Sequence, residues 1–562
     1  MLATSFAEIL SISSIFPFLG AIASPDHIFN LPVTQPIIQF FDLSRSEQIL
    51  LPLTLIFIVA VLFASSLRLL LLWANTRLSY AIGADLGVSI YRRTLYQPYA
   101  IHCSRNSSEI INGVTNKTAS MISIITHLLS IISAVVILVG ILVILLSVNP
   151  TIALIAFGGF SFIYIGIVQL MRARLIAGSS IIANESTQVI KSLQEGLGGI
   201  RDVLIDGTQN AYCEVYRKAD LALRKAQASS HFIQASPRFA VEGLAMVLIA
   251  GLAYFLVQEP DGLVKALPLL GVLALGAQRL LPLLQQAYGS WTAIQSGKMS
   301  LQDGLDLLDQ PLPDYATKPS PLPIPFRRQI KLANLSFRYE ISAPFVLNDL
   351  NFVISKGDRV GFIGTTGSGK STTIDIIMGL LEPSEGALIV DEQILNNLNR
   401  RAWQARIAHV PQAIFLSDTT IEENIAFGVP RAEIDPDRVR QSALQAQLDS
   451  TIISWPRGYR TLVGERGIRL SGGQRQRIGI ARALYKRADV LIFDEATSAL
   501  DEETEQAVMQ AIESLSRDIT MLIIAHRHST LKNCTKIIEL DAGRIKKIGS
   551  YQDIIEPTAS HP

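Results

Sequence analysis

The stretch Val360-Gly361-Phe362-Ile363-Gly364-Thr365-Thr366-Gly367-Ser368-Gly369-Lys370-Ser371 decides the fold of the C-terminal part of this chain. Its first four residues form a short strand-like run, and a helical pattern follows from Ser371 to Leu381, so the pattern GxxxxGK(S/T) lies between a strand and a helix. Glycines let backbone N–H groups surround a phosphate, and a helix N-terminus adds a favourable dipole. We therefore predict a nucleotide site in which Lys370 reaches the β- and γ-phosphates of ATP and the Ser371 hydroxyl binds Mg²⁺. The predicted phosphate-binding residues are Gly364, Thr365, Thr366, Gly367, Ser368, Gly369, Lys370, Ser371 and Thr372.

A second motif, Val490-Leu491-Ile492-Phe493-Asp494-Glu495, is an apolar run that ends in two carboxylates. Such a run is typical of a buried parallel strand, and the carboxyl ends of parallel strands are where α/β sheets bind ligands. Asp494 is placed to hold Mg²⁺, and Glu495 is the candidate base that orients or activates the attacking water. An acidic pair after a strand is common by chance, but together with the glycine-rich loop it predicts nucleotide hydrolysis.

Short apolar strands alternate with helical stretches through the C-terminal part, which predicts an α/β domain with a mainly parallel, covered sheet. Two of the expected helices are Ser371–Leu381 and Gly473–Tyr485. The expected strands are Gln329–Tyr339, Arg359–Ile363, Ala387–Val390, Ile407–Pro411, Val490–Phe493 and Met521–Ile524.

The composition of the 562-residue chain separates a membrane part from a water-soluble part. Charged residues make up only 17% of the chain, against about 25% in an average soluble protein, and the deficit lies before residue 326. This excludes a disordered protein and a single soluble enzyme, and three widely spaced cysteines exclude a disulfide-stapled protein. The net charge of +1 gives no reason to expect a nucleic-acid partner.

Six apolar runs precede residue 285, and each is about the 20 residues that a helix needs to cross the hydrocarbon core. The runs are Leu2–Ala23, Ile49–Trp73, Met121–Val148, Thr151–Met171, Phe239–Val257 and Gly262–Leu284. They predict an all-α, six-helix transmembrane domain embedded in a lipid bilayer. The long connections Ala74–Ser120 and Arg172–Arg238 are rich in basic residues and should face the cytoplasm. The C-terminal domain then also faces the cytoplasm, from a plasma membrane that we take to be a bacterial inner membrane.

The predicted domains are a transmembrane domain over 1–308, a proline-rich linker over 309–326, an ATPase domain over 327–556 and a tail over 557–562. Proline at the density found in Asp309–Phe326 prevents helix formation and favours an extended chain.

The first span begins at Met1 without a basic flank, so we expect a short cytoplasmic lead-in before Met1 in the native protein. The alternatives are a short first helix and a signal peptide, although a signal peptide would carry a basic N-terminal region.

The segment Leu470-Ser471-Gly472-Gly473-Gln474 resembles the signature of ATP-binding cassette (ABC) proteins. In isolation it could be no more than a helix cap. However, the neighbouring motifs also match this family, in order, over the C-terminal part of the chain. They are Tyr339, Gln412 in Val-Pro-Gln, Ser498-Ala499-Leu500-Asp501 and His526 in Ile-Ile-Ala-His-Arg.

The resemblance implies roles for these residues. Tyr339 would stack on adenine, and Gln412 would bind the nucleotide and Mg²⁺. Asp501 would belong to the D-loop and to the nucleotide-binding residues. His526 would act beside Glu495 in catalysis. In this family the glycine-rich loop of one subunit and the Leu470–Gln474 segment of another enclose one ATP.

The chain has one copy of each motif, so the resemblance implies a half-transporter of the exporter branch. It would pair with a second copy of itself or with a related half-transporter. Short helices within the two long connections would transmit motion between the domains. We expect them around His102–Ser108 and around Asp206–Cys213.

Arg68 and Arg279 lie within or near the ends of the second and sixth spans, where charged residues are costly and usually functional. A guanidinium facing a water-filled path suits a phosphate or pyrophosphate head group. The alternative is a structural role, in which the arginines extend to the membrane surface or pair with Glu8 or Glu242.

Glu8–Leu19, Phe63–Leu72 and Leu275–Pro282 look similar to flippases of lipid-linked oligosaccharides and to cyanobacterial relatives linked to envelope polysaccharide. We therefore expect ATP-driven export or flipping of an amphiphilic, glycolipid-like substrate. The alternatives are a multidrug, peptide or lipid A-type exporter, and an ATP-gated channel or regulatory membrane protein.

Overall fold

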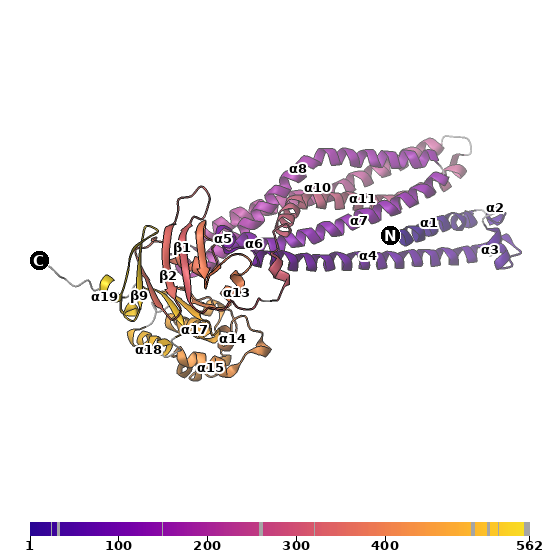
Figure 1. The fold of residues 1–562 in the computed structure, drawn as a ribbon. Coiled ribbons are helices and arrows are strands. Elements are labelled where there is room, and N and C mark those ends of the chain that lie inside the picture. Colours follow the sequence, from indigo (N-terminus) through magenta and orange to yellow (C-terminus); the bar gives the residue numbers. More distant parts are fainter. Residues whose placement is uncertain are drawn as a thin grey trace. The chain divides into compact units, whose positions relative to one another are not determined.

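The computed structural model of the chain describes all residues except 24, 31–33, 149, 258–261, 320, 496–500, 514–517, 526–527 and 556–562. It divides into two compact units (Figure 1). The first comprises Met1–Gln97 and Arg105–Leu312, and the second comprises Pro98–Ser104 and Pro313–Pro562. The division near residue 312 falls inside the proline-rich stretch predicted as a linker.

The first unit is helical, as predicted, and the six predicted spans fall in the six long helices of its described part. These are α1 (Leu2–Ala23), α4 (Leu50–Leu95), α7 (Thr118–Val148), α8 (Pro150–Gly198), α10 (Gln209–Val257) and α11 (Gly262–Leu308). Among the described residues, four helical segments are long and apolar enough to cross a membrane: Leu2–Ile22, Ser46–Leu95, Ser107–Val143 and Ser161–Gly198. The other two predicted spans contain side chains outside the description, among them those of residues 255–279.

The long polar connections are continuous with the spans. Helix α4 has 46 residues, which at 1.5 Å per residue is about 69 Å, more than twice the thickness of the hydrocarbon core. Helices α8, α10 and α11 have 49, 49 and 47 residues. The apolar part of α4 exposes large side chains such as Leu51, Leu62 and Leu69, as expected for a surface that faces lipid rather than water.

Short elements join the long helices at their ends. The first predicted transmission segment, around His102–Ser108, covers the end of α5 (Tyr99–Ser104) and the start of α6 (Ser107–Asn112). A π-helical turn, η2 (Gly113–Lys117), connects α6 to α7. Between α1 and α4, the chain forms three short elements: α2 (Pro25–Phe29), α3 (Gln35–Phe40) and η1 (Ser46–Ile49).

The second predicted transmission segment lies too far along the chain. The short helix is α9 (Ile200–Ile205), whereas Asp206–Cys213 contains a turn at Gly207 (φ +64°) and the first residues of α10. The helix starts earlier because Gly199 interrupts α8 with a non-helical conformation (φ −96°, ψ 22°) and precedes α9 as its cap residue.

The second unit contains two sheets. The larger one has the strand order β10-β9-β3-β8-β7-β6, and its strands pair in parallel except for β10. Its strands are β3 (Arg359–Ile363), β6 (Ile407–Val410), β7 (Val490–Asp494), β8 (Thr520–Ile524), β9 (Lys536–Asp541) and β10 (Arg544–Gly549). The smaller sheet is antiparallel, with the order β2-β1-β4-β5. It consists of β1 (Gln329–Phe337), β2 (Leu347–Ser355), β4 (Glu385–Val390) and β5 (Gln393–Ile394).

The prediction of one mainly parallel sheet is therefore correct only for the larger sheet. The predicted strands near 329–339 and 387–390 pair with each other in the antiparallel sheet. Strand β4 turns directly into β5 through Asp391 and Glu392, both with positive φ (44° and 75°), the conformation of a two-residue hairpin turn. Parallel strands need a crossover of a dozen or more residues, which is absent between β4 and β5.

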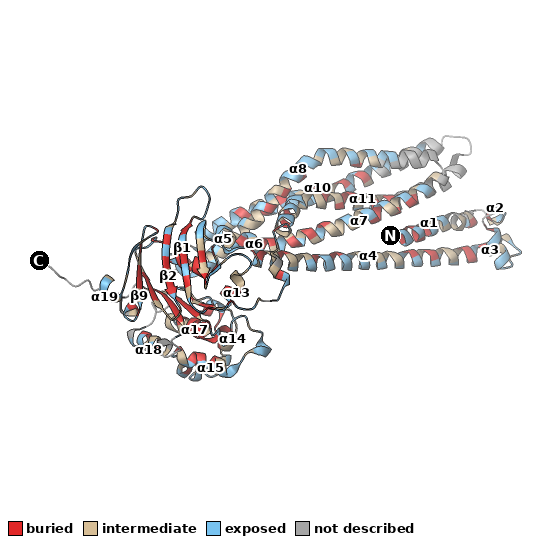
Figure 2. Ribbon diagram, viewed as in Figure 1, coloured by how far each residue is buried: buried red, intermediate tan, exposed pale blue. Residues whose placement is uncertain are grey.

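Helices cover the larger sheet and bury its strands. Figure 2 shows the buried residues of this unit concentrated along the strands. The covering helices include α12 (Lys370–Ile377), α14 (Ile421–Ile425), α15 (Pro436–Gln445), α17 (Gly472–Tyr485) and α18 (Glu502–Glu513). On one side of the sheet, Trp403 is fully buried and donates its ring N–H to the Ile377 carbonyl at 2.7 Å.

Candidate functional site

The glycine-rich loop joins β3 to α12, as predicted, and its glycines are required by its geometry. Gly364 has φ +145°, and a Cβ there would lie 2.2 Å from the Leu540 carbonyl oxygen. Gly369 has φ +98°, and its Cβ would lie 2.4 Å from Leu347 Cδ2. Only glycine adopts such conformations without strain. The loop therefore packs tightly against strands β9 and β2 at the start of α12.

Lys370 is the first residue of α12 and turns back into the loop. Its Nζ donates hydrogen bonds to the carbonyl oxygens of Gly364 and Thr365, both at 2.9 Å. Burial lowers the pKa of the ammonium, while the charges of Glu495 and Asp494 oppose the shift. The Ser368 hydroxyl is buried in the same loop without a hydrogen-bond partner. A confined cation, an unsatisfied hydroxyl and a helix N-terminus together fit a phosphate group.

The acidic pair lies at the carboxyl end of β7, with Gln412 beside it. Gln412 follows β6, and its Nε2 donates to Glu495 Oε2 at 2.6 Å. The Glu495 backbone has φ +51°, and its N–H donates to the Ile524 carbonyl at the end of β8 at 3.0 Å. Because β6, β7 and β8 are parallel neighbours, their polar end residues meet at one edge of the sheet, where ligands are bound.

Asp494 and Lys370 are electrostatically linked. Burial and then the charge of Glu495 raise the pKa of Asp494, while Lys370 lowers it. A divalent cation would relieve the repulsion between the two carboxylates. Ser371, Gln412 and Asp494 supply a hydroxyl, an amide and a carboxylate, the oxygen donors that Mg²⁺ prefers. The described residues contain no group of three or more His, Cys, Asp or Glu that could hold a metal ion by themselves.

A third carboxylate of this site was missed in the sequence. Asp375 lies on α12, and burial together with the charge of Asp494 raises its pKa from 3.8 to about 6. It lies four residues after Ser371, and residues at i and i+4 share one face of a helix. That spacing could have identified it from the sequence.

Tyr339, predicted to stack on adenine, lies next to the first turn of α12. Its hydroxyl is 3.3 Å from Thr372 Oγ1, another predicted site residue. The ring packs edge-on against Phe337 with the centroids 5.0 Å apart, and the residue is 54% exposed. An exposed aromatic face beside a phosphate-binding loop is a suitable platform for a base.

The segment Leu470–Gln474 caps helix α17. The Ser471 hydroxyl accepts from the Gln474 N–H at 3.2 Å, and Gln474 Oε1 accepts from the Ser471 N–H at 2.9 Å. Gly472 and Gly473 begin the helix, and Leu470 is buried. Within one copy of the chain, the simple helix-cap interpretation therefore describes the segment. Its predicted contact with a nucleotide on a second copy stays a prediction.

Asp501 caps α18, where it accepts from Thr504 N at 2.9 Å and from Thr504 Oγ1 at 2.8 Å. These hydrogen bonds lower the pKa of Asp501. The preceding residues, Ser498–Leu500, and the predicted catalytic His526 lie outside the described residues.

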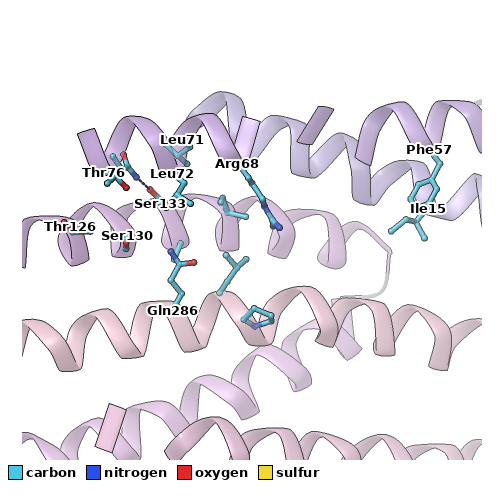
Figure 3. A pocket seen from close by; sticks show the side chains of 15 residues that line it. Ile15, Phe57, Arg68, Leu71, Leu72, Thr76, Thr126, Ser130, Ser133 and Gln286 are labelled. Atoms are coloured by element: carbon cyan, nitrogen blue, oxygen red, sulfur yellow. Dashed lines mark hydrogen bonds between the residues drawn. The ribbon is translucent and has the colours of Figure 1, made fainter. Parts of the chain in front are cut away.

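The first unit contains a cavity of about 500 Å³ lined by α1, α4, α7 and α11. Arg68 lines it, and Figure 3 shows its side chain extending from its helix toward the cavity. Arg68 Nε is 2.5 Å from Glu8 Oε1, and Glu8 is almost completely buried. The sequence suggested Glu8 or Glu242 as ion-pair partners. Arg68 forms its ion pair with Glu8, whereas Glu242 forms an ion pair with Arg238 at 2.8 Å. The side chain of Arg279 lies outside the described residues.

Comparisons with known proteins agree with both halves of this description. The family model described as "ABC transporter transmembrane region" matches residues 3–259, and the model described as "ABC transporter" matches residues 347–498. The chain is similar over its whole length to a bacterial Atm1-family ABC exporter solved with ATP bound. The two are 25% identical with a TM-score of 0.77, over 97% of this chain and 95% of that one.

Two curated relatives have different names. An ATP-dependent lipid A-core flippase of Alkalilimnicola ehrlichii is 31% identical over 65% of this chain and 61% of its own length. The ABC transporter ATM1 of Toxoplasma gondii is 42% identical over 38% of this chain and 18% of its own length. The matches thus span less than two thirds of these relatives' lengths.

Proposed function

Because this chain belongs to the ABC transporters, and joins a helical transmembrane domain to an ATPase domain, we propose that it is an ATP-driven exporter or flippase. It acts as a half-transporter in a plasma membrane, with the ATPase domain in the cytoplasm. The observation that carries the proposal is the hydrogen bond between Gln412 and Glu495, residues 83 positions apart, at the sheet edge next to the glycine-rich loop.

The chain's own groups divide the work of hydrolysis. The loop amides and Lys370 bind the phosphates, and Tyr339 stacks on the adenine ring. Ser371, Gln412 and Asp494 would hold Mg²⁺, which would offset the negative charge that develops on the phosphates. Glu495 orients and activates the attacking water, and Gln412 holds its carboxylate in position. His526 is proposed to assist at the γ-phosphate.

The proposed assembly is a homodimer. Each chain has one glycine-rich loop and one Leu470–Gln474 segment, so two chains complete two equal sites. Pairing with a related half-transporter is the alternative, and copurification of two differently tagged copies of this chain distinguishes the two.

Replacing Glu495 with Gln tests the hydrolytic role. The carboxamide keeps the shape and can still contact Gln412, but it cannot accept a proton from water. We expect ATPase activity to fall by about 10²–10⁴-fold, with ATP binding retained. The matched control is Glu392→Gln, an equal charge change on an exposed side chain that pairs with Arg328 at 3.2 Å. Unchanged ATPase activity in Glu495→Gln would refute the assignment.

The proposed substrate is an amphiphile with a large polar head group, such as a lipid-linked glycan. Its support is the cavity in the transmembrane unit, which has both apolar and polar lining residues. The relative named a lipid A-core flippase favours a lipid A-type substrate as the alternative. Reconstituted protein should move a fluorescent amphiphile between leaflets only with hydrolysable ATP. An ATP-gated channel would instead pass ions without moving lipid.

A further inference from the structure

The cavity in the transmembrane unit has one ionisable residue among the described residues that line it, and its charge is already balanced. That residue is Arg68. Its Nε lies 2.5 Å from the carboxylate of Glu8, which is 1% exposed. A buried carboxylate next to a guanidinium leaves little net positive field for a further anion. A phosphate in the cavity would have to displace Glu8 or lie near its charge, and an uncompensated buried carboxylate is very costly.

The other polar groups of the cavity are neutral and include both hydrogen-bond donors and acceptors. The Thr126 hydroxyl donates its proton to the Ile122 carbonyl at 2.9 Å, and the Ser133 hydroxyl donates to the Leu129 carbonyl at 2.8 Å. The Thr126 oxygen therefore offers lone pairs to a ligand, whereas Ser133 Oγ already accepts a hydrogen bond from Asn75 Nδ2 at 3.4 Å. The remaining polar lining side chains are those of Asn75, Thr76, Ser130 and Gln286.

This set of neutral donors and acceptors fits a ligand that can both donate and accept hydrogen bonds. Sugar hydroxyls donate and accept, so they can satisfy hydroxyl oxygens and carboxamides at the same time. Phosphate oxygens at neutral pH mainly accept, so they would leave acceptors such as the Thr126 oxygen without a donor. An unsatisfied polar pair in a desolvated site is penalised more than a missing contact.

The cavity also has an apolar end. Figure 3 shows Ile15 and Phe57 at one end, with Thr76, Thr126 and Ser130 toward the other. Arg68 extends into the space between them. The lining thus offers both apolar and polar contacts, as an amphiphile requires.

We propose that this cavity binds amphiphiles with an uncharged, hydroxyl-rich head group, such as a glycosyl group, and that Glu8 excludes anionic head groups by neutralising Arg68. The inference rests on the proposed function and names the substrate class for it. It replaces the expectation, drawn from the sequence, that Arg68 receives a phosphate or pyrophosphate.

The first test uses the full-length wild-type protein in phosphatidylcholine vesicles. Glucosyl diacylglycerol and phosphatidic acid with the same acyl chains are compared as stimulators of ATPase activity. Stimulation by the glucosyl lipid with little response to phosphatidic acid is the expected result. Equal stimulation by both lipids would overturn the inference and leave the proposed function intact. Stimulation by neither would overturn the inference, and the leaflet-transfer assay described above would then decide the proposed function.

The second test removes the negative charge that balances Arg68. In Glu8→Gln, the amide oxygen still accepts from Arg68, but the guanidinium charge is no longer balanced. We expect the half-saturating concentration of phosphatidic acid to fall by about tenfold, the effect of one charge-assisted hydrogen bond. The double variant Glu8→Gln, Arg68→Gln should return to the wild-type preference, and it also covers the case in which the single variant folds poorly. The matched control, Glu242→Gln, breaks the ion pair with Arg238 away from the cavity lining and should keep the wild-type preference. A Glu8→Gln protein that folds and keeps that preference would overturn the inference.

Discussion

Single charged residues determine the chemistry of the nucleotide site. Lys370 is held by two loop carbonyls, and its pKa is lowered by burial. Burial raises the pKa of both Asp494 and Asp375, with a further increase from the charge of Glu495 for Asp494 and from the charge of Asp494 for Asp375. The site therefore holds acidic groups under electrostatic strain, which a bound cation would relieve.

Replacing Asp375 with Asn should stabilise the nucleotide-free protein at neutral pH. The folded-state pKa of Asp375, about 6, is above its ordinary value of 3.8. The folded state thus binds this proton more tightly, and wild-type stability falls as pH rises through this interval. Asn does not ionise, so its advantage should be small near about pH 4 and reach about 1 kcal/mol above about pH 6.5, after allowance for solvent screening. Thermal unfolding of both proteins across this pH range measures the difference. An advantage that grows at acidic pH would contradict the assignment.

Replacing Gly364 with Ala should disrupt the phosphate-binding loop. The new Cβ would lie 2.2 Å from the Leu540 carbonyl oxygen, a backbone atom that cannot move aside easily. We expect loss of binding of a fluorescent ATP analogue. The control is Gly367→Ala, which also has positive φ (82°) but no atom within 4 Å of the new Cβ. It should cost only the backbone strain of about 1–2 kcal/mol.

At the scale of elements, helix ends and strand ends position the functional residues. Helix α12 presents Lys370 and Ser371 in its first turn, and α17 begins with the capping box of Ser471 and Gln474. Strands β6, β7 and β8 deliver Gln412, Glu495 and the Ile524 carbonyl to one edge. Each functional side chain lies where a regular element leaves backbone groups unsatisfied.

The capping box of α17 separates a structural from a functional role of Ser471. Replacing Ser471 with Ala removes the cap and should destabilise the protein by about 1 kcal/mol. Thr keeps the cap hydroxyl and should restore most of that stability. If Ser471 also contacts ATP on a second copy, the Ala variant should lose much more ATPase activity than its stability loss explains. Melting temperature and ATPase rate, measured together, distinguish these outcomes.

At the scale of the molecule, one chain contains two units whose surfaces suit different surroundings, lipid for the first and water for the second. The helices of the first unit expose large apolar side chains, whereas the second unit buries them around its sheets (Figure 2). Each unit has its own core, and the proposed transport cycle would need both. The proposed dimer adds a further requirement, because each ATP site is completed by a second copy.

Mixed dimers test whether the two sites work together. If wild-type and Glu495→Gln chains are reconstituted in equal amounts and both sites must hydrolyse, only dimers of two wild-type chains are active. The ATPase rate should then fall to roughly a quarter of the wild-type rate. Independent sites, or a functional monomer, would give about half. Assay of mixtures at several ratios distinguishes the two curves.

The sequence by itself determined the features that depend on neighbouring residues. The strand, loop and helix around Gly364–Ser371 follow from local spacing, and the six long helices follow from the length of apolar runs. The position of the acidic pair, Asp494 and Glu495, at the end of β7 also follows from the local sequence. In each case a contiguous segment contains all the information, because hydrogen bonding and hydropathy act over a few residues.

Only the tertiary structure decided which distant residues meet. It placed Gln412 on Glu495 and paired Arg68 with Glu8, and it assigned β1 and β4 to a separate antiparallel sheet. It also brought the charge of Asp494 close enough to Asp375 to raise the pKa of Asp375. These outcomes depend on how helices and strands pack, and packing balances burial, charge and chain connection over the whole unit. The same residue types at the same spacing allow several partners, and the fold selects one.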